Sequence, residues 1–278
     1  MSSTPVFSFS RLKTLDQCEF QYARRYGDRS YSARESIEAF VGKTVHSIIE
    51  ADHGPLQKTD LDLISAVAER FDREHSSENH YDVKAKGLSH WRSHALTCFQ
   101  NYLRIGRVRE GWRLHAIEKK LAMPLSLTPM CSIMGILDRA IAREPQAGDL
   151  YAPYEIHDFK TGRKQPERYF LEDHQLPLYS ALLVHALNLP EDSVMRCSRI
   201  YLGEGQIASI MVDRARREEA LAWARDRARR ALEFERRYAE TRMAETTVTP
   251  LCGWCVYRAG CPAHQAAPSS APRASEVM

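Results

Sequence analysis

The feature that most constrains this chain is an alternating segment at residues 155–162, which follows a strand-like segment ending in Asp138. Side chains alternate between the two faces of a strand. Asp158 and Lys160 therefore share one face, while Phe159 can enter the core on the other. Two carboxylates could then hold a divalent cation while the lysine orients a water molecule or offsets developing charge. The segment predicts a strand that carries metal-dependent hydrolytic chemistry.

Residues on either side of this segment extend the pattern. His46 precedes it on an expected helix, while Gln175 and Tyr179 follow it on one helical face. Together with the Gly-x-x-Asp and Asp-x-Lys strands, they run in the order found in one family. The chain resembles the PD-(D/E)xK nuclease superfamily, and more narrowly its RecB-like branch, between residues 46 and 179. Asp-x-Lys alone is common by chance, so the order of all these features carries the resemblance.

The resemblance implies both a fold and an activity. The expected fold is α/β (a mixed α+β sheet), with a restriction-endonuclease-like core, an added N-terminal helical block and a C-terminal iron-sulfur region. The expected activity is Mg- or Mn-dependent hydrolysis of DNA, most simply by an exonuclease on single-stranded or frayed ends in DNA repair, recombination or CRISPR spacer processing. The residues implied for the active site are His46, Asp138, Asp158, Phe159, Lys160, Gln175 and Tyr179.

Within this set, His46, Asp138, Asp158 and the backbone carbonyl of Phe159 would hold the cation, and Lys160 would handle the nucleophile. Oxygen ligands suit magnesium or manganese, and an imidazole ligand favours manganese. Lys160 could position the water as an ammonium group. It could instead deprotonate the water if burial and the cation lower its pKa.

Three of the candidates have plainer alternatives. Glu118, in the first expected strand of the sheet, is a weaker candidate for the metal site or its surroundings, because related nucleases often have a glutamate there. It could equally be a solvent-facing carboxylate. The helical face bearing Gln175 and Tyr179 borders the active site in RecB-like nucleases and touches DNA or the general base. The alternative is a buried glutamine beside an aromatic ring.

Cysteines near the two ends of the chain form a second group of candidate ligands. Cys252-Gly-Trp-Cys255 is followed by Cys261, and Cys18 stands alone near the start. Such closely spaced thiols are typical of metal ligands, and four thiolates can make a closed zinc site. The odd total of 7 cysteines does not favour a disulfide framework. The residues alone leave zinc and iron-sulfur open.

The resemblance favours iron-sulfur. Many RecB-like nucleases bind a four-iron, four-sulfur (4Fe-4S) cluster through one N-terminal cysteine and a C-terminal Cys-x2-Cys-x5-Cys, which ties the two ends of the domain together. Relatives usually have Pro after the first cysteine, where this chain has Glu19. By resemblance, the cluster ligands are Cys18, Cys252, Cys255 and Cys261. The other cysteines, Cys98, Cys131 and Cys197, lie in apolar runs and are expected to be buried thiols.

Charge and hydropathy limit the cellular setting. The formal net charge of +3 is too small to indicate a nucleic-acid binder. Basic residues gather near the start and at 214–242, where a solvated helix with internal ion pairs is the plainer interpretation. No apolar run is long enough to span a membrane, and the start resembles no secretory signal. We therefore expect a cytoplasmic protein.

The expected organisation is one nuclease domain over 1–264, with a disordered tail at 265–278. Within it we expect a helical insertion at about 55–108, a nuclease core at about 109–212, and a C-terminal helix with the cysteines at 213–264. Periodicity predicts helices at about 8–26, 36–52, 59–74, 88–105 and 173–187, and strands at 112–123, 131–142, 154–160, 195–202 and 207–212. The first three strands should form an antiparallel meander, and the last two a hairpin turning at 203–205.

One hypothesis from another class is a DNA-binding accessory subunit of a helicase-nuclease complex that does not cut. Intact Asp138, Asp158 and Lys160 argue against it, since decayed nucleases commonly lose one of these residues. The chain has no Walker-type phosphate loop and therefore no motor of its own. A helicase or a CRISPR adaptation protein is therefore a possible partner.

Overall fold

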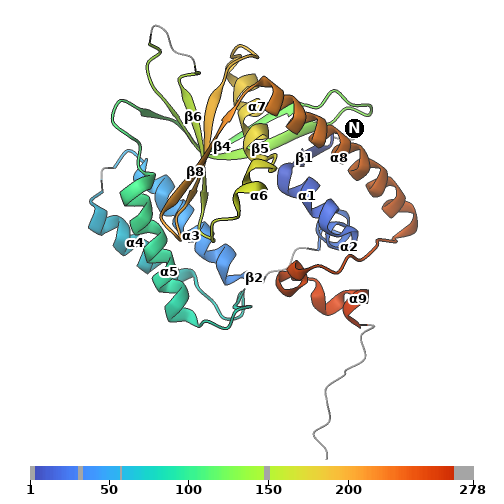
Figure 1. Ribbon diagram of the computed structural model, residues 1–278. Coiled ribbons are helices and arrows are strands. Elements are labelled where there is room, and N and C mark those ends of the chain that lie inside the picture. Colours follow the sequence, from blue (N-terminus) through green and yellow to red (C-terminus); the bar gives the residue numbers. More distant parts are fainter. Residues whose placement is uncertain (1–3, 31–33, 57, 147–150, 266–278) are drawn as a thin grey trace, which may run out of the picture.

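The computed structural model describes residues 4–30, 34–56, 58–146 and 151–265. The tail at 266–278, for which we expected disorder, lies outside them, as do residues 147–150 between two expected strands. Figure 1 shows a mixed sheet with helices on both of its faces. None of the described helices is long and apolar enough to cross a membrane.

The sheet has the predicted meander and hairpin. Its strands are β1 (Val6–Ser8), β4 (Arg113–Pro124), β5 (Ser132–Ala142), β6 (Tyr154–Lys160), β7 (Met195–Tyr201) and β8 (Gln206–Val212). The order is β1-β5-β6-β7-β8, and β4 also pairs with β5. The pairs β4–β5, β5–β6 and β7–β8 are antiparallel, whereas β1–β5 and β6–β7 are parallel. The short strand β1 was not predicted, because three residues carry no readable period.

One face of the sheet is covered by the helical block α3 (Ile37–Asp52), α4 (Asp60–Glu74) and α5 (Leu88–Asn101). Thr59 begins α4 with a capping box to Asp62, and a π-helical turn, η2 (Tyr102–Gly106), follows α5. Phe159 of β6 is 2% exposed and packs among the apolar side chains of these helices. This confirms that Phe159 points away from its two polar neighbours.

The other face is covered by α7 (Gln175–Leu187), with α1 (Phe9–Gln17) and the long α8 (Arg214–Thr241) packed beside it. Small side chains line the buried stripe of α8 and allow close packing: Ala220, Ala224, Ala228 and Ala231. Pro177 lies in the first turn of α7, where a missing backbone N–H does least harm. A short helix that was not among the predicted elements, α6 (Glu167–Leu171), precedes α7 and buries Phe170.

The first predicted helix is wrong at Cys18. Ser8 does cap α1, accepting a hydrogen bond from the N–H of Arg11, but the backbone is extended at Cys18 and restarts as α2 (Glu19–Tyr22) and a π-helical turn, η1 (Ala23–Gly27). The N–H of Phe20 donates to the carbonyl of Glu245 at 2.9 Å. This long-range contact favours the break, which local periodicity could not reveal.

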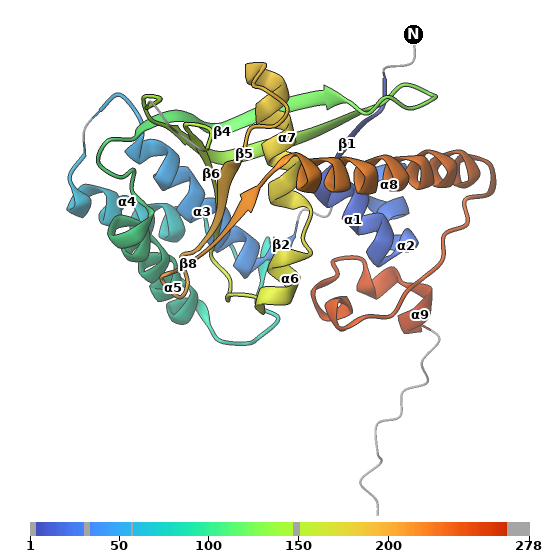
Figure 2. The ribbon, with the colours of Figure 1, turned by 45° about the horizontal axis from the view of Figure 1, so that its top comes forward.

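The segment after α8 returns beside α1 and α2, away from the sheet (Figure 2). It contains η3 (Pro250–Trp254), η4 (Arg258–Gly260) and α9 (Pro262–Gln265). Two further short strands, β2 (Glu35–Ser36) and β3 (His80–Tyr81), pair at the edge of the helical block. The hydroxyl of Tyr81 donates to the carbonyl of Trp254 at 3.1 Å, so this block also contacts the C-terminal segment.

Candidate active site

The candidate site lies where two strands separate. Along one edge of β5, β1 pairs with residues 132–134 and β6 with residues 139–142, which leaves residues 135–138 between the two pairings. Asp138 lies at the end of this gap. Its Oδ2 accepts the backbone N–H of Phe159 at 2.7 Å. This carboxylate therefore takes the place of the next backbone hydrogen bond between β5 and β6. The sheet therefore presents the carboxylate of Asp138 and the carbonyl of Phe159 at one point.

The glycine of the Gly-x-x-Asp strand has a steric cause. A Cβ atom at Gly135 would lie 2.7 Å from a ring carbon of Tyr179 and 2.9 Å from a methyl group of Leu182. Helix α7 can therefore approach β5 only because no side chain stands there. Gln175 Nε2 donates to the Tyr179 hydroxyl at 2.9 Å and lies 3.4 Å from Asp158 Oδ1. The glycine thus allows Gln175 and Tyr179 to lie beside Asp158.

His46, Glu118 and Asp138 form what we call the acidic cluster. Their ligand atoms all lie within 4.8 Å of one another. His46 Nδ1 is 3.4 Å from Glu118 Oε1 and 3.9 Å from Asp138 Oδ2, and Nε2 donates to the carbonyl of Phe159 at 3.2 Å. An imidazole, two carboxylates and a carbonyl are a donor set suited to manganese or magnesium. The residues present therefore fit a divalent cation.

Glu118 belongs to the cluster rather than to the solvent-facing side of its strand. Its φ of 43° is in the left-handed region, which a non-glycine residue seldom adopts within a strand. The neighbouring register, which pairs Ile117 with Arg139 and Lys119 with Leu137, places Glu118 opposite Asp138. Such strained positions concentrate at functional sites. The conformation of Glu118 accompanies the turn of its side chain towards His46.

Asp158 lies beside this cluster but is held by different partners. It is 1% exposed, and the register of β5 and β6 places it opposite Asp138. Lys160 Nζ donates to its Oδ1 at 2.8 Å, and Arg199 Nε donates to its Oδ2 at 3.2 Å. The predicted sharing of one face by Asp158 and Lys160 is confirmed. The assignment of Asp158 as a cation ligand stays a prediction.

Sequence reasoning missed Arg199 and Asp173. Arg199 pairs with Asp158 across the parallel strands β6 and β7, and its Nη2 donates to Asp173 Oδ1 at 2.7 Å and to Gln175 Oε1 at 3.2 Å. Its side chain is only 4% exposed. A planar guanidinium thus fixes two carboxylates and an amide in place. The same strand carries a second arginine and a serine, so no local signal singles out Arg199.

The electrostatics of the site favour a bound positive ion. Burial, followed by the charge of Asp158, raises the pKa of Asp138 to about 7, although His46 and Lys160 act in the opposite direction. Burial also lowers the pKa of Lys160, but Asp158 and Asp138 outweigh it and the net shift is upward. Lys160 is therefore an ammonium group here, which supports water positioning rather than proton abstraction.

The protonation of His46 is set by the same neighbours. Burial lowers its pKa, but the hydrogen bond with Glu118 and the charge of Asp138 outweigh this effect, and the pKa is raised. Both ring nitrogens face oxygen acceptors. A ligand imidazole must be neutral at the coordinating nitrogen, so binding of a cation here would release a proton.

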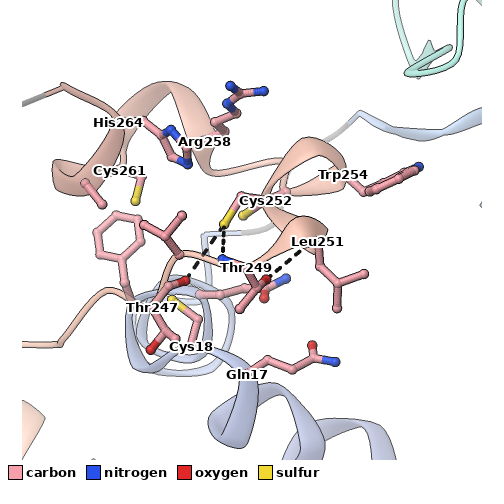
Figure 3. Close-up of a pocket in the computed structure, with 15 residues that line it drawn as sticks. Gln17, Cys18, Thr247, Thr249, Leu251, Cys252, Trp254, Arg258, Cys261 and His264 are labelled. Carbon is pink, nitrogen blue, oxygen red and sulfur yellow. Dashed lines mark hydrogen bonds between the residues drawn. The ribbon is translucent and has the colours of Figure 1, made fainter. Parts of the chain in front are cut away.

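A separate pocket gathers the four cysteines predicted as ligands. Figure 3 shows Cys18, Cys252 and Cys261 directed into it, and Cys255 also lines it. Its volume is about 230 Å³. Cys18 enters from the break between α1 and α2, and the other three come from the turns around η3 and η4. We call this the cysteine pocket.

The thiols of the cysteine pocket act on one another electrostatically. Burial raises the pKa of Cys255, and the charges of Cys18, Cys252 and Cys261 raise it further. All four are free cysteines. Within the described residues, no three of these sulfur atoms lie within 4.8 Å of one another. By contrast, Cys98 and Cys197 are buried thiols elsewhere in the core, as predicted.

The chain is similar to a protein-family model and to solved structures. Residues 6–262 match the family model described as the PD-(D/E)XK nuclease superfamily. The chain is similar to the crystal structure of a candidate exonuclease from Eubacterium rectale, with 16% identity, a TM-score of 0.52, and coverage of 88% of this chain and 86% of that one. The structure of SSO0001 matches with 13% identity, a TM-score of 0.34, and coverage of 80% and 96%. No match was found among curated proteins. The first of these structures shows a shared fold.

Proposed function

The chain belongs to the PD-(D/E)XK nuclease superfamily, and from this membership and the acidic cluster we propose that it is a Mg- or Mn-dependent deoxyribonuclease of RecB-like type. The proposed reaction is hydrolysis of DNA phosphodiester bonds in the cytoplasm. The single observation that carries the proposal is the convergence of an imidazole and two carboxylates beside the Asp-x-Lys strand.

The residues proposed to hold the cation are His46, Asp138, Asp158 and the carbonyl of Phe159, to which the geometry adds Glu118. A divalent cation bound there would neutralise charge on the scissile phosphate and make water a better nucleophile. The mixed donor set favours manganese over magnesium, because imidazole is the softer ligand.

The remaining residues would orient the reactants. The ammonium group of Lys160 would hold the attacking water, with Asp158 fixing its position. Arg199 would keep Asp158 in place, and its pairing with Asp173 supports this role. Gln175 and Tyr179 would border the substrate on the α7 side.

We further propose that the enzyme is an exonuclease on single-stranded or frayed DNA ends in repair, recombination or CRISPR spacer processing. A helicase or a CRISPR adaptation protein would supply unwinding. The test is digestion of end-labelled single and double strands with Mg²⁺ or Mn²⁺, beside the Lys160→Ala protein and a Lys58→Ala control at an exposed lysine outside the site. We expect metal-dependent product from the wild type and the control alone. Binding of DNA without product would instead indicate an accessory subunit.

We also propose that the cysteine pocket binds a 4Fe-4S cluster. Zn–S bonds of about 2.3 Å bring tetrahedral thiolates to within roughly 4 Å of one another. A 4Fe-4S cluster instead holds each thiolate on a different iron, and the gathering of four thiols around one pocket supports this proposal. Anaerobically purified protein should be brown and contain iron and sulfide, and Cys255→Ser should lower both. A colourless protein with stoichiometric zinc would refute the cluster.

A further inference from the structure

A second cavity lies beside Lys160 and shares Gln175 and Arg199 with the candidate active site. It has a volume of about 300 Å³ and lies between the end of β6, the end of β7 and the start of α1. Sites for small molecules occupy roughly 300–1,000 Å³, so this one has room for a single small ligand. We call it the Tyr201 pocket.

The Tyr201 pocket has a positive lining. Lys13, Lys160, Arg163 and Arg199 contribute cationic groups, against the carboxylate of Asp173. That carboxylate is already shared, since it lies 2.7 Å from Arg199 Nη2 and 3.7 Å from Lys13 Nζ. Arg163 is exposed and makes no ion pair with any described residue. The lining is therefore suited to an anion.

An unpartnered buried hydroxyl points to the same kind of ligand. Tyr201 is 2% exposed, lines the pocket, and lies next to Lys160 in the register of β6 and β7. Its hydroxyl is buried without a hydrogen-bond partner in the described part of the chain. A buried hydroxyl left unpaired costs free energy that a matching acceptor would recover. A phosphate oxygen beside the lysine is such an acceptor.

One wall of the pocket is aromatic. The ring of Phe9 lines it, and Lys13 Nζ lies 5.4 Å from the centre of that ring. Phe9 also packs against Trp223, with the ring centres 5.3 Å apart, which holds the ring in place. Nucleic-acid bases stack on such rings whatever their identity. The pocket therefore offers a flat apolar surface and a cationic end, as a nucleotide requires.

We propose that the Tyr201 pocket binds one nucleotide with its phosphate, namely the terminal nucleotide of the strand that is cut. Tyr201 donates to a phosphate oxygen, Arg163 and Lys160 neutralise the phosphate, and the base lies on Phe9. This inference rests on the proposed nuclease function and names the part of its substrate that the site selects. A pocket for one nucleotide explains how cutting would proceed from an end.

The test is calorimetric titration of metal-free protein with deoxythymidine monophosphate, with thymidine and inorganic phosphate as comparison ligands. We expect the monophosphate to bind most tightly, since it alone uses both ends of the pocket. Tyr201→Phe should weaken binding about tenfold, the value of one hydrogen bond to a charged group, without lowering the melting temperature. Arg163→Ala, an exposed change that should leave the fold intact, should weaken binding to a similar extent.

Tyr102→Phe is the matched control. Tyr102 is also buried, but its hydroxyl donates to Asp52 at 2.7 Å. Loss of that hydroxyl should lower the melting temperature and leave nucleotide binding unchanged. Thymidine binding as tightly as its monophosphate, or unaltered binding by both Tyr201→Phe and Arg163→Ala, would overturn the proposal. Neither assay requires cleavage, so the pocket can fail while nuclease activity stands, and the reverse.

Discussion

The acidic cluster and the cysteine pocket are both assembled from residues far apart in the sequence, but they are held in different ways. Around the cluster, side chains fix one another: Asp158 is 1% exposed and is bound by Lys160 and Arg199, and Asp138 accepts a backbone N–H. Each polar group has a partner on a strand or helix of the core. The cluster is therefore ordered before any ion binds.

The cysteine pocket has far weaker support. Cys18 Sγ makes a long contact of 4.0 Å with the carbonyl of Glu245, and Cys252 Sγ lies 3.8 Å from that of Thr247. Of the described residues from 250 to 265, only Cys261 is buried. The segment has short helical turns and little core of its own. The difference indicates that the fold itself holds the first site, whereas the second has little support of its own and would be ordered by the proposed cluster.

The largest effect should come from Asp138→Asn. The amide keeps the shape of the side chain and can still accept the N–H of Phe159, but it removes the charge that a cation needs. We expect cleavage to fall by about 10²–10⁴-fold. Rates on labelled single strands with Mn²⁺ measure this. Retained activity would show that the cluster is not the catalytic centre.

A smaller loss is expected for Arg199→Lys. An ammonium group cannot reach Asp158, Asp173 and Gln175 together. The carboxylate of Asp158 on β6 is then held less firmly. Changes in the groups that position metal ligands typically cost about 10–100-fold. Activity should fall by that amount and require more Mn²⁺ for half-saturation. Arg196→Lys, on the same strand and half-exposed, is the control and should change neither value.

Cys18→Ser should loosen the C-terminal segment rather than change DNA cleavage directly. Without this ligand the C-terminal segment loses its link to the N-terminal helices, and trypsin should cut after Arg242 about tenfold faster. Cys98→Ala, which removes a buried thiol elsewhere, should leave that rate unchanged. Equal protection of the two variants would mean that the segment is ordered by the fold after all.

The last expected effect is on the stability of the fold and not on cleavage. Because the folded-state pKa of Asp138 is raised from 3.8 to about 7, protonation stabilises the fold, and this contribution is lost as pH rises through that window. Metal-free wild type should lose up to about 4 kcal/mol between pH 4 and 8 that Asp138→Asn does not lose, because each unit of the shift corresponds to about 1.4 kcal/mol. Urea denaturation at both pH values measures the difference. A larger loss in the variant would reverse the assignment.

Local pattern was sufficient for much of this architecture. Strand 154–160 has the predicted bounds, and its alternation places Phe159 in the core and Lys160 beside Asp158. Gln175 and Tyr179 share a face because their spacing on a helix requires it. Each of these predictions depends only on residues that are close together in the sequence, where helix or strand periodicity determines which side chains share a face.

The parts that were missed depend on long-range pairing. Arg199 stands beside Asp158 only because α7 carries the chain across to a parallel strand in this register. The place of the unpartnered Tyr201 hydroxyl beside Lys160 follows from the same strand pairing, two residues further along. The break at Cys18 likewise depends on Glu245. In each case the contacting residues are far apart in the sequence, so local periodicity cannot predict the contact.

The link between α8 and the first helices has a consequence for synthesis. Arg11 pairs with Glu235, and Tyr22 packs edge-on against Phe234 at 5.5 Å, so α1 and α2 are completed by residues made much later. At about 5–20 residues per second, the wait is on the order of ten to fifty seconds. During that time, the face of the nascent N-terminal segment that α8 later covers is exposed to solvent. A chaperone near the ribosome exit would therefore meet this protein first at its amino-terminal helices.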